Sequence, residues 1–330
     1  MMVGQLSVVE LARKISSCVE NDLIARLGGS RVLLRKVALR PVDGLRTWRT
    51  PLPQLLAAGG DPSRWQSALA DQVVQIPGVA AARPAGRGLD VELELIGQQD
   101  HAALLPTQDG GLRLWLGSGS CLQIEAAQRG GVREEVFVAA LSGCASAVGD
   151  CVERVVTPAQ GVRVRYEEKT HQVRCALVQI DGQLLREEDV DALGSAVVAW
   201  ALLLAAPARA VELYSTELLA RKAGNAAFVV AHARLRAALT VRSGDEYCRG
   251  VVSGGDRRRI EQLSVLLISW PFVLEQAVAT YSPRLVARHL LAVGELVQEA
   301  RWLPVPVARS VLSVVDDGVA ALGVALPHRV

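Results

Sequence analysis

The sequence predicts an α+β fold with a small N-terminal α/β domain, an α/β middle region and an all-α helical bundle at the C-terminal side. Two patterns support this order. Residues 76–95 combine a turn with alternating apolar residues, as in short strands, whereas apolar residues recur at helical spacing through most of residues 187–322. The chain has 330 residues, of which 50% are hydrophobic, so it can bury the cores of two or three domains.

The N-terminal region is expected to begin with helices and to end in a hairpin. Helices are predicted over residues 5–27, up to residue 58 and over residues 62–75. The turn Ile76-Pro77-Gly78-Val79 then leads into two short strands on either side of Gly86-Arg87-Gly88.

A basic segment lies between the first two predicted helices. Against the single acid Asp43 it carries six positive residues, namely Arg31, Arg35, Lys36, Arg40, Arg46 and Arg49. So many charges could release several counterions from RNA, although a solvated basic face explains them equally well. The net charge of the chain is only +2, so any nucleic-acid binding must come from such local clusters.

Residues 97–177 carry weaker patterns. Strand-like alternation occurs over residues 112–116 and 162–166, helical spacing occurs over residues 134–154, and residues 167–171 are most simply a hairpin tip. The Gly-Ser-Gly-Ser turn at residues 117–120 is not followed by Gly-Lys-Ser or Gly-Lys-Thr, so it does not predict a phosphate-binding loop.

Helical patterns dominate from Glu187 onward. Helices are expected at residues 187–190, 197–204, 226–239, from 260, over 273–279, 285–300 and 307–322, with Trp270-Pro271-Phe272 separating the fourth from the fifth. In the helix over residues 226–239, the stripe that is expected to face the core consists of Phe228, Ala231, Leu235 and Ala238.

Two parts of the chain resemble arginyl-tRNA synthetases. The Ala231-His232-Ala233-Arg234 helix, with the helical block that ends at Val330, resembles their DALR anticodon-binding domain, and residues 30–96 are similar to their N-terminal additional domain. The resemblance implies a tRNA-elbow-facing domain over 1–96, a degenerate α/β middle over 97–177 that is a reduced or replaced catalytic core, and a DALR-like bundle over 178–330.

The catalytic signatures of that family are absent from the sequence. No two of the five histidines lie three apart, so no His-x-Gly-His exists, and the only methionines are Met1 and Met2, so no Lys-Met-Ser-Lys exists. We therefore expect no catalytic residues and no amino-acid activation by this chain alone. The aromatic platform of the family is also reduced, since Ala227, Phe228, Val229 and Val230 stand where its members carry Tyr-Val-Gln-Tyr.

The resemblance implies that tRNA or another structured RNA is the partner. The expected RNA-binding residues are the six of the basic segment together with Phe228, His232, Arg234, Arg236, Arg257, Arg258 and Arg259. Two alternatives stay open. The chain could be an interaction or regulatory subunit that docks on a full-length synthetase or a biosynthetic enzyme, or an enzyme that uses aminoacyl-tRNA or ligates arginine to tRNA only with a partner.

The scattered cysteines and histidines predict neither a metal site nor a cofactor. Reduced thiols and the lack of a signal-peptide pattern predict a cytoplasmic protein. No membrane association is expected, because the longest uncharged run, residues 192–208, is shorter than the ~20 residues that a spanning helix needs.

Overall fold

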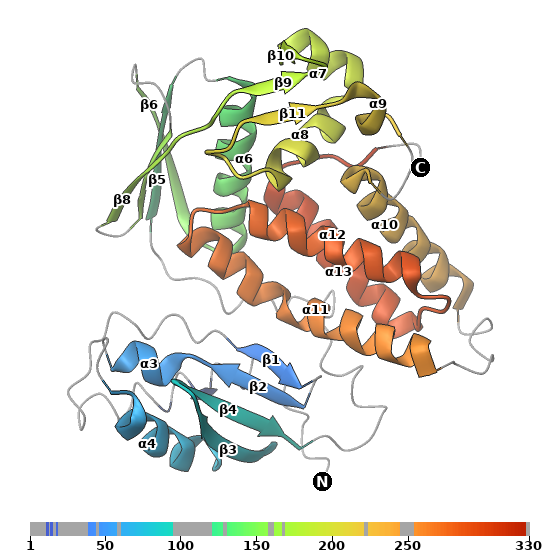
Figure 1. Ribbon diagram of the computed structural model, residues 1–330. Coiled ribbons are helices and arrows are strands. Elements are labelled where there is room, and N and C mark those ends of the chain that lie inside the picture. Colours follow the sequence, from blue (N-terminus) through green and yellow to red (C-terminus); the bar gives the residue numbers. More distant parts are fainter. Residues whose placement is uncertain are drawn as a thin grey trace. The chain divides into compact units, whose positions relative to one another are not determined.

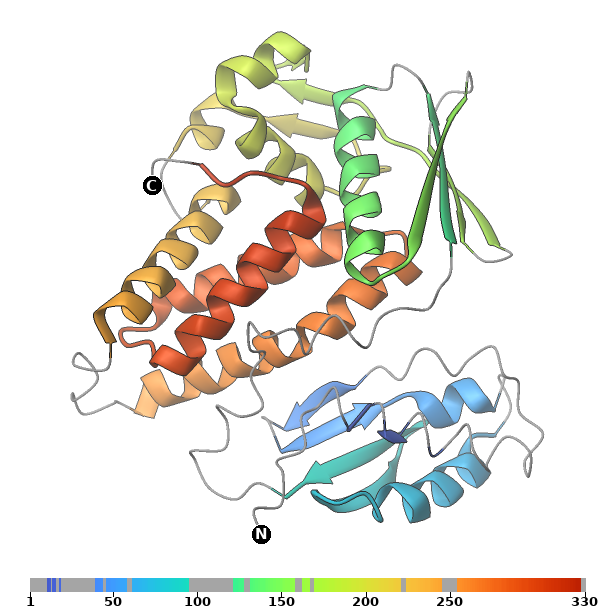
Figure 2. The ribbon, with the colours of Figure 1, turned by 180° about the vertical axis from the view of Figure 1, so that it is seen from behind.

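The computed structural model describes residues 11–12, 14–15, 18, 39–43, 46–57, 61–94, 121–127, 131–157, 162–166, 169–220, 224–244 and 254–327. The chain divides into two compact units (Figures 1 and 2). The first contains residues 1–106 and 261–272, and the second contains residues 107–260 and 273–330. The mixed architecture, with sheets first and helices toward the C-terminal end, confirms the predicted α+β class.

The first unit is a four-stranded antiparallel sheet with two helices. Its strands, in the order β1-β2-β4-β3, are β1 (Arg40–Asp43), β2 (Thr47–Thr50), β4 (Gly88–Leu93) and β3 (Val79–Ala85). The helices are α3 (Leu52–Leu56) and α4 (Ser63–Val73), and α4 packs on β3 and β4. The predicted hairpin and the helices expected up to residue 58 and over residues 62–75 are confirmed. Most of the helix expected over residues 5–27 lies outside the described residues. β1 and β2 were not predicted in the basic segment.

The hairpin between β3 and β4 is held to α4 by a buried amide. Gln66 Nε2 donates to the carbonyl oxygens of Gly86 and Gly88, both at 2.8 Å. Gly86 has a φ of +57°, a left-handed conformation that favours glycine. At Gly88 a Cβ would lie 2.6 Å from the Thr50 carbonyl oxygen on β2, so a side chain does not fit there.

The second unit begins with a four-stranded sheet in the order β6-β5-β7-β8. Its elements are β5 (Cys121–Ala127), α6 (Val132–Ala147), β6 (Cys151–Thr157), β7 (Val162–Tyr166) and β8 (Lys169–Val173). β5 and β6 are parallel and are connected through α6, so they form a βαβ unit, and β7 and β8 add antiparallel strands.

Two predictions for this region were wrong. The helix expected over residues 134–154 ends at Ala147, because Gly149 turns the chain at a φ of +78° and the valine-rich residues that follow form β6. Lys169 to His171, expected at a hairpin tip, lie within β8. The strand expected over residues 112–116 lies outside the described residues.

A second, smaller sheet of the same unit has the order β10-β9-β11. It consists of β9 (Val178–Ile180), β10 (Gln183–Leu184) and β11 (Val211–Leu213), and its helices are α7 (Glu187–Leu193), α8 (Ser195–Leu204) and α9 (Ser215–Leu218). β9 and β11 are parallel. The prediction of a helical bundle over 178–330 therefore does not hold for its first part, which contains this sheet. From Ala226 onward the described elements are all helices.

The helices that follow are α10 (Ala226–Ser243), α11 (Gly254–Ala279), α12 (Arg284–Glu299) and α13 (Val305–Leu322). α10, α12 and α13 pack on one another, and α8 packs on α10 and α12. Residues 261–272 of α11 cluster with the first unit and its two ends with the second. Among the described residues only α11 is long and apolar enough to cross a membrane by length and composition, a test that buried core helices also pass.

The helix break expected at Trp270-Pro271-Phe272 is wrong, since α11 continues through Pro271. Proline removes one helical hydrogen bond. A buried apolar stripe runs past it on both sides and stabilises the continuous helix; its members are Leu263, Leu267, Trp270, Leu274 and Ala277.

α10 buries a different face from the predicted one. Its buried residues are Ala227, Val229, Val230, Ala231, Ala233 and Ala237. Of the expected stripe only Ala231 is buried, and Leu235 is 45% exposed. α10 is apolar on more than one side, so periodicity alone does not identify its core face, and packing does: a Cβ at Gly294 of α12 would lie 2.7 Å from Val229 Cγ1.

A second glycine joins the βαβ unit to the bundle. A Cβ at Gly143 of α6 would lie 2.2 Å from the carbonyl oxygen of Ala321 on α13. α6 thus lies between the sheet and α13, as both views show (Figures 1 and 2). The second unit is one packed body in which a β-rich half and a helical half share α6.

Candidate nucleic-acid interface

In the basic segment of the first unit, the described arginine side chains form ion pairs with acidic residues of β4. Arg49 on β2 forms a two-pronged ion pair with Asp90 on β4, with Nε to Oδ1 at 2.6 Å and Nη2 to Oδ2 at 2.8 Å. Arg46 Nη2 lies 2.5 Å from Glu92 Oε1. Arg40 lies in β1, and Arg31, Arg35 and Lys36 lie outside the described residues. The two arginines of the basic segment whose side chains are described, Arg46 and Arg49, are therefore both paired with acids.

Arg234 of the Ala-His-Ala-Arg sequence also has an acidic partner. Its Nε lies 2.5 Å from Asp316 Oδ1, so the pair connects α10 to α13. The hydrogen bond with Asp316 raises the pKa of Arg234, and both side chains are about half exposed. Exposed pairs of this kind contribute ~0.2–1 kcal/mol, so Arg234 could exchange Asp316 for a phosphate at small cost.

Arg236 has a structural role instead. Its Nη1 donates to the carbonyl oxygen of Val297 at 2.5 Å, and its Nη2 donates to that of Ala300. These carbonyls lie at the C-terminal end of α12, where carbonyl groups lack helical partners and the helix dipole favours a cation. Burial lowers the pKa of Arg236. A guanidinium group that is committed in this way is a poor phosphate ligand.

Phe228 and His232 form the one aromatic pair on α10 in the described part of the chain. Their ring centroids are 6.1 Å apart with an interplanar angle of 25°. Both residues are half-buried, and His232 Nδ1 is buried without a hydrogen-bond partner among the described residues. The pair is a small stacking surface, far less than a row of aromatic platforms would provide.

Exposed arginines gather where α10 ends, α11 begins and α12 meets α13. Arg242 is in the last turn of α10, Arg257 and Arg258 are in the first turns of α11, and Arg301 follows α12. All four are exposed, and no ion pair within the described part of the chain engages them. We call these four residues the arginine end.

Contacts between the helix ends hold the arginine end together. The Arg301 amide donates to Asp256 Oδ1 at 3.4 Å. Arg259 lies 3.7 Å from Asp256 and 3.6 Å from Glu299, so it connects α11 to α12. Of the predicted triple arginine, Arg257 and Arg258 thus have no acidic partner among the described residues, and Arg259 is structural. Arg242 and Arg301 were not predicted as RNA-binding residues, although each stands beside a predicted helix end, which is the signal that could have found them.

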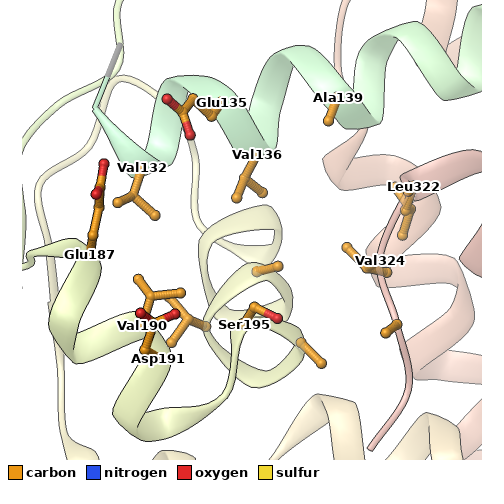
Figure 3. A pocket seen from close by; sticks show the side chains of 15 residues that line it. Val132, Glu135, Val136, Ala139, Glu187, Val190, Asp191, Ser195, Leu322 and Val324 are labelled. Carbon is orange, nitrogen blue, oxygen red and sulfur yellow. The ribbon is translucent and has the colours of Figure 1, made fainter. Parts of the chain in front are cut away.

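A cavity of about 470 Å³ lies elsewhere in the second unit, between α6, α7, α8 and the residues after α13 (Figure 3). Its floor is apolar, with Val132, Val136 and Leu322 among the lining. Its charged groups are the carboxylates of Glu135, Glu187 and Asp191, and no lysine or arginine lines it. This cavity therefore repels phosphate, which leaves the arginine end as the candidate interface.

No group of three or more His, Cys, Asp or Glu side chains within the described ranges is arranged to hold an ion. The chemistry available at the arginine end is charge-assisted hydrogen bonding to oxyanions by guanidinium groups, which suits phosphate.

The comparisons with known proteins identify the fold. No protein-family model and no curated protein matches the chain. The structure is similar to Thermus thermophilus arginyl-tRNA synthetase, with a TM-score of 0.62 and 9% identity over 96% of this chain and 99% of that one. A Campylobacter jejuni protein assigned as an arginyl-tRNA synthetase matches with a TM-score of 0.37 and 12% identity, over 56% of this chain and 43% of that one. The chain thus has an arginyl-tRNA synthetase-like fold.

Proposed function

We propose that this chain binds structured RNA, with tRNA as the first candidate, through the arginine end, and does not activate an amino acid. The observation that carries the proposal is a set of four exposed guanidinium groups, without ion-pair partners in the described part of the chain, at one end of a synthetase-like helical bundle. RNA phosphates are the oxyanions that such a cluster fits. The proposal includes the assignment of residues 1–96 to a tRNA-elbow-facing domain, of 97–177 to a reduced catalytic core and of the later helices to a DALR-like bundle, in the cytoplasm.

The loss of amino-acid activation rests on the sequence. The spacing of the five histidines excludes a His-x-Gly-His signature, and Met1 and Met2 cannot supply a Lys-Met-Ser-Lys loop. Activation develops charge on transferring phosphates, which those residues stabilise in the family that the chain resembles. Purified protein is therefore expected to show no arginine-dependent exchange of pyrophosphate into ATP. Exchange above the level of a sample without arginine would contradict this part of the proposal.

RNA binding is tested by titrating labelled tRNA at several salt concentrations. The wild-type chain is expected to bind with an affinity that falls steeply between about 50 and 200 mM salt, as counterion release requires. Removal of two phosphate contacts in the variant Arg257→Ala/Arg258→Ala is expected to reduce the slope of log K against log salt by about 2. Arg288→Ala is the matched control, because Arg288 is an exposed arginine on α12 nearer its N-terminal end.

The outcome separates specific from general binding. The comparison uses an arginine tRNA, a different tRNA and an RNA hairpin of equal length. Similar affinities and similar salt slopes for all three would indicate contacts to phosphates without recognition of bases. No salt-dependent binding of any of them by the folded wild-type chain would overturn the proposal. So would an equal loss of affinity in Arg288→Ala and in the double variant.

Docking on a full-length arginyl-tRNA synthetase is the competing function. It is favoured by one observation: Leu235 and Leu239 of α10 are 45% and 54% exposed on the same side of the helix. The test is size-exclusion chromatography of a mixture with the host's purified synthetase. A complex that is lost in Leu235→Ser/Leu239→Ser but kept in Arg257→Ala/Arg258→Ala would support docking over RNA binding, and two separate peaks would exclude it.

A further inference from the structure

Two exposed cysteines lie opposite each other at the start of two parallel strands. Cys121 is the first residue of β5 and Cys151 is the first residue of β6, and the strand register pairs them directly. Both thiols are free and exposed. β5 and β6 lie side by side in the sheet (Figure 1). Two residues paired across adjacent strands direct their side chains to the same face, so these thiols are neighbours.

The spacing suits a disulfide bond. Neighbouring strands are ~4.8 Å apart, and disulfides join Cα atoms that are ~4.4–6.8 Å apart. The Cys151 side chain lies close enough to the Cys121 thiol to raise the pKa of that thiol. Both residues begin their strands, where the backbone can adjust by the small amount that the bond needs. A covalent link between them therefore requires no rearrangement of the sheet.

We propose that Cys121 and Cys151 form a reversible dithiol–disulfide site that exchanges with low-molecular-weight disulfides of the glutathione class. One cysteine loses its proton and attacks a sulfur of the small disulfide, which forms a mixed disulfide and releases one small thiolate. The second cysteine then attacks the protein sulfur of that bond and releases the second small thiolate. Two electrons pass to the small disulfide, and the two cysteine protons end on the two released thiols.

The other described cysteines are shielded from this exchange. Burial raises the pKa of the Cys144 thiol to about 12 and that of Cys175 to about 11, and it also raises the pKa of Cys18. Each is buried or half-buried, and none is paired in register with another cysteine on the described strands. Exposure together with a partner thiol thus selects Cys121 and Cys151.

Exposure also makes the bond reversible. A disulfide at the surface is open to attack by small thiolates, and exposed disulfides are in general the labile ones. The neighbouring Cys151 side chain raises the pKa of Cys121, as do the nearby carboxylates of Glu153 and Asp150. Attack by the thiolate is accordingly expected to be faster at alkaline pH than at neutral pH.

The test uses the full chain, reduced, desalted and incubated with oxidised glutathione at about pH 8. Remaining thiols are alkylated, and the protein is analysed as intact mass and as peptides without reduction. Two of the six cysteines are expected to escape alkylation. The intact mass of the protein before alkylation is expected to fall by the mass of two hydrogen atoms, with no glutathione added. A disulfide-linked peptide pair is expected to contain Cys121 and Cys151. Dithiothreitol is expected to reverse all three changes.

Variants distinguish a paired site from general reactivity. Cys121→Ser and Cys151→Ser are each expected to trap one glutathione on the remaining cysteine, since no second thiol resolves the mixed disulfide. Cys175→Ser is the matched control and is expected to keep the Cys121–Cys151 link. The proposal is overturned if the wild-type chain retains a stable glutathione adduct on either residue, if the two residues remain fully alkylated, or if the link joins two chains or other cysteines.

Discussion

Arg236 of α10 donates from Nη1 to the main-chain carbonyl oxygen of Val297 at 2.5 Å, where α12 ends. The same guanidinium group donates to the carbonyl of Ala300. A residue that the sequence suggested as an RNA ligand therefore closes the end of a helix. The geometry separates arginines that hold the bundle together from arginines that remain free to meet a phosphate.

Arg236→Ala is expected to destabilise the protein by about 1.5–3 kcal/mol, because two half-buried carbonyl groups lose a charged donor. The measurement is the free energy of unfolding in urea. Arg234→Ala is the matched control on the same helix: its exposed pair with Asp316 contributes no more than about 1 kcal/mol. Equal effects of the two variants would show that the carbonyls at the end of α12 do not depend on Arg236.

Arg49→Ala is expected to leave RNA affinity within about twofold of wild type, since Arg49 neutralises Asp90 and offers no free charge. Its stability is expected to stay close to that of the wild type, because solvent screens this surface ion pair. The check is the tRNA titration at low salt, run beside Arg257→Ala/Arg258→Ala. If Arg49→Ala weakens binding as much as that double variant does, the RNA contact lies on the β2–β4 face.

The strongly amphipathic helices were predictable from the sequence. The patterns at 285–300 and 307–322 match α12 (Arg284–Glu299) and α13 (Val305–Leu322) to within two residues. In α12 the apolar stripe is unambiguous, since Val286, Leu290, Val293 and Val297 are all buried. Where one face alone is apolar, periodicity identifies both the helix and its core side.

The errors occurred where long-range contacts decide the structure. α10 is apolar on more than one side, and its core face is chosen by Gly294 of α12. β1 and β2 lie in an arginine-rich segment that pairs with β4, whose acid Asp90 is 41 residues beyond Arg49. Local charge suggested a nucleic-acid surface there, because the compensating acids are distant in the sequence.

In the candidate site, too, local patterns were predictable and long-range contacts were not. Arg257 and Arg258 were predictable as a basic cluster, and the structure leaves both exposed. The pairing of Arg234 with Asp316 spans 82 residues, so no local pattern could have revealed it. The place of Arg242 and Arg301 beside that cluster depends on how three helix ends meet, which only the packing shows.

Gly143→Ala is expected to destabilise the second unit by about 1–3 kcal/mol or more. Its Cβ would lie 2.2 Å from the Ala321 carbonyl oxygen, so α6 and α13 must separate. Gly254→Ala is the control, since nothing lies within 4 Å of its Cβ position, and its stability is expected to stay within about 0.5 kcal/mol. Thermal and urea unfolding measure the stability of both variants. A wild-type stability in Gly143→Ala would show that α6 and α13 do not pack this closely.

The buried thiol of Cys144 is expected to make stability fall at alkaline pH. Burial raises its pKa from the ordinary 9.0 to about 12, so the folded state retains a proton that the unfolded state loses. This stabilisation is complete below pH 9 and is lost as the pH rises from 9 to about 12, at up to about 1.4 kcal/mol per pH unit. Urea unfolding under reducing conditions between about pH 8 and 10.5 measures it. Cys144→Ala lacks the group and is expected to show a shallower decline, whereas identical slopes would mean that the thiol ionises equally well in both states.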